Sequence, residues 1–341
     1  MGKLMIQPAP TQMDAVGIEP LTPRTALESP AARDEVRPGE RRVSTFSRLK
    51  FEFVRGFLWA IARGFSLRGL YLFGTFFGTL EYLVNFKRRA RYRGELRKLF
   101  SEGRLTPSRE KRIIRSYFCR TRCDKLFYLI FDKLPKEKIL HRVRFHGREN
   151  LDAALLRERG VFVMLSHVGS HHVAALLMAL LGYKCAGVRD RNEGPLRRFI
   201  QDKYLKTFPE YASMRMLYAD SFPRDIFRCF NENRVVGAAL DVGRFRGSTL
   251  RSVPVRIFGE TREFLTGTLQ VALRCRATIC PAFVVSRPNF YFRLIVHPPI
   301  YSPPADQQPI ENQELIAELM QKYADGIEQH VREHPDHLSR A

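Results

Sequence analysis

The sequence predicts an α/β fold with a mixed, mainly parallel sheet flanked by helices and an N-terminal membrane-associating helical segment. Three observations carry this expectation. Apolar, β-branched runs alternate with helical patterns from residue 143 onward, an aromatic and aliphatic stretch covers residues 46–86, and a strongly basic stretch follows it directly. With 341 residues, the chain is long enough for one large domain with appendages.

The alternating part is defined by short runs whose periodicity switches between strand and helix. We expect strands over 143–146, 161–165, 235–240, 253–258, 278–285 and 291–296, and helices over 150–158, 171–181, 195–208, 266–274 and 313–333. Thr106 and Pro107 are typical of a helix start and predict a further helix that runs towards Leu134. Such alternation favours a sheet with helices on both faces.

The N-terminal part divides by composition. Residues 1–46 contain prolines and scattered charges without periodicity and are expected to be a disordered tail. We expect a hydrophobic membrane-associating segment over 47–88 and the α/β domain over 89–335. The longest uncharged piece, Gly69 to Leu80, has 12 residues, short of the roughly 20 that cross a bilayer. An amphipathic or re-entrant anchor, with Trp59 and Tyr82 at the interface, fits this pattern. A buried helix pair of a soluble domain is the alternative.

Charge restricts the partners. The chain carries 57 Lys and Arg against 35 Asp and Glu, a net charge of +22. Residues 87–125 hold 15 basic and 4 acidic side chains, so this region alone contributes +11. A nucleic acid, an anionic bilayer or an acidic protein would suit such a surface. The sequence has no nucleic-acid-binding signature, and the preceding apolar stretch favours anionic membrane lipids at the cytoplasmic face of the inner (cytoplasmic) membrane.

One segment is the strongest candidate for chemistry. The strand over 161–165 is followed by His167, Gly169 and Ser170, with Ser170 expected to cap the next helix. Catalytic groups of α/β proteins lie at the carboxyl ends of strands. A second apolar strand ends in Asp241. His167, His171 and His172 do not follow a metal-binding spacing, and we expect neither a metal nor a cofactor.

Further candidates lie after His167: Arg189 at the end of a strand, and Phe258, Gly259, Thr266 and Gly267 around a predicted helix start. In this order the segments resemble the lipid A biosynthesis (lauroyl/myristoyl) acyltransferase family of the lysophospholipid acyltransferase superfamily, over roughly residues 50–300. The resemblance implies a membrane-associated acyltransferase that moves a fatty acyl chain from an acyl thioester to a hydroxyl of a glycolipid or phospholipid.

The family motif is His, four residues, then Asp or Glu, and His167 occupies the position of the general base. His172 stands where the carboxylate is expected. A neutral imidazole cannot supply the negative charge that favours imidazolium, and loss of the carboxylate costs on the order of 10⁴ in rate in hydrolase triads. Three alternatives follow: another acid such as Asp241 or Asp190 replaces it, His172 forms a weaker dyad, or the chain is a lipid-binding pseudoenzyme.

The resemblance also implies substrate contacts and partners. Arg189 would clamp a headgroup phosphate, because a guanidinium group matches phosphate oxygens bidentately, or it is a solvated charge. The resemblance assigns Gly169, together with the glycine and threonine pair at 266–267 and Phe258-Gly259, to substrate binding or to shaping the fold. The donor is acyl carrier protein or acyl-CoA, since both are acidic and match a basic surface.

Overall fold

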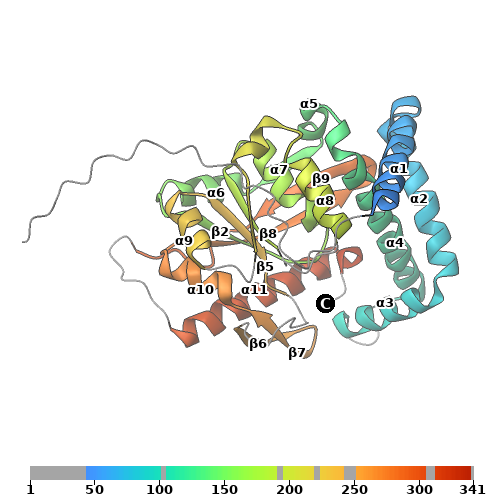
Figure 1. Ribbon diagram of the computed structural model, residues 1–341. Helices are drawn as coiled ribbons and strands as arrows, with labels where there is room; N and C mark the ends of the chain where they lie inside the picture. Colours follow the sequence, from blue (N-terminus) through green and yellow to red (C-terminus); the bar gives the residue numbers. More distant parts are fainter. Residues whose placement is uncertain are drawn as a thin grey trace, which may run out of the picture. The chain divides into compact units, whose positions relative to one another are not determined.

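The computed structural model describes residues 44–100, 105–189, 195–218, 223–241, 251–304 and 312–338. All of them belong to one compact unit that begins at Val43. Within these residues, seven strands form one sheet in the order β1-β9-β8-β2-β5-β3-β4, and β6 and β7 form a separate hairpin (Figure 1). The strands are β1 (Val143–His146), β2 (Val161–Leu165), β3 (Cys185–Arg189), β4 (Arg215–Tyr218), β5 (Val235–Ala239), β6 (Ser252–Ile257), β7 (Glu260–Leu265), β8 (Thr278–Arg287) and β9 (Tyr291–Val296).

The sheet is mixed and mainly parallel, as predicted. β8, β2, β5, β3 and β4 run parallel, whereas β9 is antiparallel to β8 and pairs in parallel with β1. The chain leaves β2 to form β3 and β4, and returns as β5 between β2 and β3. Leu165 therefore pairs with Ala239, and the carboxyl ends of β2 and β5 are adjacent. This is the kind of position at which open α/β sheets bind ligands.

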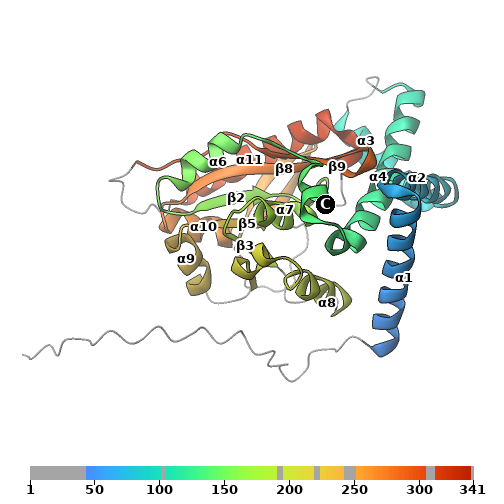
Figure 2. The ribbon, with the colours of Figure 1, turned by 90° about the horizontal axis from the view of Figure 1, so that it is seen from above.

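Helices cover both faces of the sheet (Figures 1 and 2). Alternate side chains of β2 enter different cores: Phe162 and Met164 pack with α9, α10 and α11, and Val161 and Val163 pack with the core that includes α7 and α8. The helices of the α/β part are α5 (Lys136–Leu140), α6 (Arg148–Leu155), α7 (Ala174–Leu180), α8 (Pro195–Tyr204), α9 (Pro223–Asn231), α10 (Gly267–Arg274) and α11 (Gln313–Glu333). Short 3₁₀ turns are η1 (Phe131–Lys133), η2 (His171–Val173), η3 (Pro209–Ser213), η4 (Pro288–Phe290) and η5 (Pro335–His337).

Four helices precede the sheet: α1 (Thr45–Gly64), α2 (Ser66–Val84), α3 (Phe86–Leu99) and α4 (Pro107–Ile130). α2 packs closely along α4 at Gly78. A Cβ at this position would lie 2.5 Å from the Cα of Cys119, so a larger residue would force the helices apart. α1 is held by Arg55, which is fully buried and forms an ion pair with Asp132 just beyond α4. The segment predicted as an anchor therefore has a buried side. Over the described residues, no helix combines the length and apolar character needed to cross a bilayer.

Most predicted elements are present, and the differences have local causes. β2, β9 and α11 match their predicted bounds, and Thr106 caps α4 by accepting from the backbone of Arg109. β4, β7 and α9 were not predicted. The sequence of β7 is mostly charged and polar, because one face of this strand is exposed. Ser170 does not cap a helix with its side chain, which is a correction: its hydroxyl donates to Asp124 instead, and α7 begins only after the turn η2.

Candidate active site

The loop from Ser166 to Ser170 follows β2 and is fixed by backbone contacts. Gly169 has a φ of +65°, and a Cβ there would lie 2.5 Å from the carbonyl oxygen of Val284, so only glycine fits. The Gly169 N–H donates to the carbonyl of His337 at 3.1 Å, and the Ser170 N–H donates to that of Val284 at 3.1 Å. Gly169 thus shapes the loop that presents His167, whatever its contact with substrate.

His167 meets a carboxylate. Its Nδ1 lies 2.9 Å from Oδ1 of Asp241, and its backbone N–H donates to the same carboxylate, at 2.8 Å to Oδ2. The Asp241 side chain is 8% exposed and that of His167 is 41% exposed. A buried carboxylate at Nδ1 orients the ring, stabilises the imidazolium form and directs the lone pair to Nε2. A histidine and a carboxylate in this arrangement can act as a general base and its acid.

The ring of His171 lies next to those of both His167 and His172. The rings of Tyr128 and His172 are nearly perpendicular, with centroids 5.1 Å apart, and the ring of His171 lies 5.7 Å from that of His172. His171 itself lies 5.0 Å from the ring of His167. Of the acids considered from the sequence, Asp241 is the one that the structure brings to His167. Asp190 lies outside the described residues.

A buried acid on α4 supports the loop, and the sequence analysis missed it. Asp124 is 5% exposed, and its Oδ2 accepts from the hydroxyl of Ser170 at 2.6 Å and from Ser286 at 3.2 Å. Arg120, one turn earlier, donates to the same oxygen at 2.9 Å. The available signal was position: Asp124 falls on the apolar stripe of α4, between Tyr117 and Phe127. A charge on such a stripe is normally paired.

Four histidines lie behind the loop, and two of them, His330 and His337, are buried. His297, His330, His334 and His337 surround the Phe283 ring or one another, and His330 stacks on Phe283 with centroids 4.2 Å apart. Burial lowers the pKa of His330 to about 3 and that of His337 well below its usual value. Burial is also the main cause of the lowered pKa of His297 and His334. The imidazoles of His330 and His337 are therefore neutral at physiological pH.

The remaining predicted residues differ in their distance from His167. The Leu265 N–H donates to the Leu240 carbonyl at 3.0 Å, which brings Thr266 and Gly267, at the start of α10, beside the strand end that carries Asp241. Thr266 is buried and Gly267 is exposed. The hairpin strand β7 separates this pair from Phe258 and Gly259 by roughly 20 Å at about 3.3 Å per residue.

Phe258 and Gly259 form the turn of the β6–β7 hairpin, with φ of +53° and +75°. Phe258 is buried, and its N–H donates to Glu328 of α11 at 2.8 Å, so both residues have a clear structural role. Arg189 is the last residue of β3, which pairs with β5. Its side chain lies outside the described residues, and its role as a phosphate clamp stays a prediction. Over the described residues, no group of three or more His, Cys, Asp or Glu could hold a metal ion.

Comparison with known proteins gives two findings. The sequence matches the family described as bacterial lipid A biosynthesis acyltransferase over residues 41–338. The structure is similar to the 1-acyl-sn-glycerophosphate (LPA) acyltransferase PlsC from Thermotoga maritima, with 16% identity, a TM-score of 0.35, and coverage of 80% of this chain and 98% of that one. Curated protein sequences gave no match. Since the family match spans most of its length, this chain belongs to the bacterial lipid A biosynthesis acyltransferase family.

Proposed function

We propose that this protein transfers a fatty acyl group from an acyl thioester to a hydroxyl of a glycolipid or phospholipid, with His167 as general base and Asp241 as its acid. The observation that carries the proposal is the 2.9 Å contact between Nδ1 of His167 and the Asp241 carboxylate at adjacent strand ends. Family membership supports acyl transfer to a lipid acceptor in general. Lipid A or a related glycolipid is the acceptor class we favour.

In the proposed reaction, His167 first accepts a proton and later gives it up. Nε2 of His167 takes the proton of the acceptor hydroxyl as its oxygen attacks the thioester carbonyl. The buried carboxylate of Asp241 stabilises the imidazolium formed in that step. When the tetrahedral intermediate collapses, the carbon–sulfur bond breaks and the leaving thiolate takes up the proton. The products are an ester and a free thiol, so no other reactant is needed.

A basic surface supports an acidic donor. α3 carries seven Lys or Arg residues and one Glu, and acyl carrier protein and coenzyme A are both negatively charged. Either one is compatible with this surface. A competition assay separates them: purified protein receives both donors with different acyl chains, and mass spectrometry of the product lipid identifies the chain transferred.

The distribution of apolar side chains supports attachment to the cytoplasmic face of the inner membrane. Among the described residues, every large apolar side chain that is clearly exposed, apart from Leu156 and Tyr291, lies within residues 46–86. Phe46, Phe53 and Phe65 are each about three-quarters exposed. Aromatic side chains of this kind insert at the membrane interface, and the cations of α3 suit anionic headgroups.

Substitution is a better test of attachment than deletion, because α1 and α2 also bury core residues such as Leu58 and Leu70. Trp59 is the only tryptophan of the chain, so its fluorescence reports on α1 alone. Vesicles containing brominated phosphatidylglycerol should quench Trp59, and Phe53→Ser with Phe65→Ser should reduce the quenching. Leu156→Ser is the matched control, because Leu156 is 83% exposed and lies outside α1 and α2. Unquenched Trp59 in the unmodified protein contradicts the attachment.

The decisive test of function compares lipids from cells with and without the gene by mass spectrometry. We expect one acyl chain to be missing from a lipid class, and its return with the wild-type gene but not with His167→Ala. The alternative from the altered motif, a pseudoenzyme that only binds lipid, requires both genes to restore the same lipids. Equal restoration would therefore overturn the proposed catalysis.

A further inference from the structure

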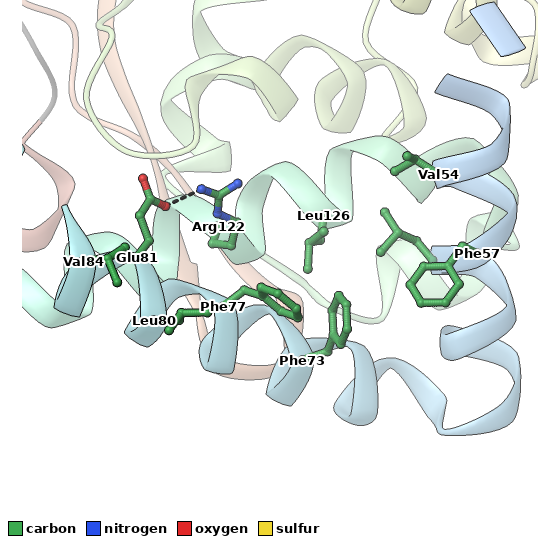
Figure 3. Close-up of a pocket in the computed structure, with 10 residues that line it drawn as sticks. Val54, Phe57, Phe73, Phe77, Leu80, Glu81, Val84, Arg122 and Leu126 are labelled. Atoms are coloured by element: carbon green, nitrogen blue, oxygen red, sulfur yellow. Dashed lines mark hydrogen bonds and ion pairs between the residues drawn. The ribbon is translucent and has the colours of Figure 1, made fainter. Parts of the chain in front are cut away.

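An apolar groove lies between α1, α2 and α4, apart from the candidate active site (Figure 3). Its volume is about 450 Å³, within the range of small-molecule sites. Val54 and Phe57 of α1 line one end, and Phe73 and Phe77 of α2 line the centre, with ring centroids 4.7 Å apart. Leu126 of α4 also lines the groove. The lining is almost entirely hydrocarbon, so the groove suits an apolar ligand.

The other end of the groove is polar and cationic. Glu81 of α2 forms an ion pair with Arg122 of α4 at this end, as Figure 3 shows. Glu81 also forms an ion pair with Arg88 of the basic helix α3. Two guanidinium groups thus share one carboxylate, which leaves a net positive charge. Arg122 is 39% exposed, against 17% for Arg88, and is the cation that a ligand can reach.

The groove lies on the far side of α4 from His167. In an α-helix, residues two positions apart point about 200° away from each other. Arg122 and Leu126 line the groove, whereas Asp124 binds Ser170 of the active-site loop and Tyr128 contacts His172. The groove is therefore not a continuation of the site where His167 would act on a thioester.

We propose that the groove binds one acyl chain of an anionic phospholipid drawn from the surrounding bilayer, with the lipid phosphate at Arg122. The hydrocarbon lining matches the chain, and the net positive charge at one end matches the phosphate. Phe57, Phe77 and Leu80, which line the groove, are among the exposed apolar residues of α1 and α2. A bilayer in contact with that surface would deliver a lipid tail directly to the groove.

The test uses full-length protein in detergent micelles and phosphatidylglycerol with a photoactivatable diazirine in one acyl chain. After irradiation, peptide mass spectrometry should locate crosslinks in 73–84 and around Leu126. Leu80→Gln, at a lining residue, should reduce crosslinking about tenfold, because it puts a polar amide in place of part of the apolar lining. Leu83→Gln is the matched control: Leu83 is on the same helix, 54% exposed and outside the lining.

Arg122→Gln tests the polar end. It should abolish the preference for phosphatidylglycerol over a diacylglycerol probe with the same chains, since only the former has a phosphate. Far-UV circular dichroism and thermal denaturation verify that each variant is folded. Three results would overturn the proposal: equal labelling of the Leu80 and Leu83 variants, labelling spread evenly over the exposed residues of α1 and α2, or displacement of the lipid probe by acyl-CoA. The last would assign the groove to the donor.

Discussion

The two groups of histidines near Gly169 have opposite environments. His167 is half-exposed and meets the carboxylate of Asp241. His330 and His337, behind the loop, are buried, and their rings face each other with Nε2 and Nδ1 3.3 Å apart. The first environment favours a charged imidazole and the second disfavours it. The comparison teaches that composition alone cannot single out a candidate catalytic histidine, whereas contact with a carboxylate and with solvent does.

The largest expected effect is on activity, from His167→Ala. In serine hydrolase triads, loss of the histidine costs on the order of 10⁶ in kcat, and we expect transfer here to fall to background. The side chain is half-exposed, and the backbone N–H of residue 167 still donates to Asp241 in the variant, so the free energy of unfolding should change little. Steady-state transfer assays and urea denaturation measure both quantities. Transfer that persists in the folded variant would remove His167 from the mechanism.

Asp241→Asn should have the next largest effect, on the order of 10⁴ in kcat by analogy with loss of the triad acid. The amide keeps an oxygen that can accept the backbone N–H of His167 but lacks the negative charge that favours the imidazolium. Asp241→Glu, which keeps the charge, should recover part of the rate. If the asparagine and glutamate variants lose the same activity, the role of Asp241 is positional and not electrostatic.

The two buried histidines, His330 and His337, should instead make the free energy of unfolding depend on pH. Because the folded-state pKa values of His330 and His337 are lowered, the unfolded chain binds more protons. Their contribution is present above pH 6.5 and is lost as the pH falls from about 6.5 towards 3, by about 1.4 kcal/mol for each unit of depression. Burial is the main cause of the lowered pKa of His337, and Arg120, His330, His334 and Arg287 add to it.

Urea denaturation at several pH values measures this dependence. His330→Leu should flatten the profile of unfolding free energy between pH 7 and 5. The substitution also removes the stack on Phe283, so the slopes of the profiles are compared and not their values at pH 7. His146→Gln, at an exposed position on β1, is the control and should leave the profile unchanged. A profile that stays equally steep in His330→Leu contradicts the assignment of this residue.

Ser170→Ala should have a moderate effect. It removes the hydroxyl that donates to Asp124 at 2.6 Å, and both groups are buried. Loss of such a hydrogen bond costs about 1–3 kcal/mol, because Asp124 loses one of its donors. Denaturant titration measures the loss. Unchanged stability would mean that the loop is held by its backbone contacts alone.

The sequence predicted the strands that carry the site better than it predicted their neighbours. Hydrophobic, β-branched runs over 161–165 and 235–240 have strong signals because both faces of those strands are buried. The adjacency of β2 and β5 could not be read from chain order, since β3 and β4 intervene. Asp241 was therefore one candidate acid among several. Asp124 was missed because its partners, Ser170 and Ser286, are 46 and 162 residues away in sequence.

The smallest expected effect is that of His172→Glu, which restores the spacing of the family motif. If Asp241 already serves Nδ1 of His167, a second carboxylate adds little, and kcat should stay within about a factor of three, or under 1 kcal/mol. His172→Gln, assayed in parallel, separates the loss of the imidazole from the gain of a charge. A rate that rises at least tenfold with glutamate but not with glutamine would show that His172 replaced a working acid and formed a weaker dyad. An unchanged rate, together with the loss in Asp241→Asn, means that the carboxylate of the dyad comes from the segment just after β5 and not from the turn η2. The altered motif then does not remove the acid that catalysis requires.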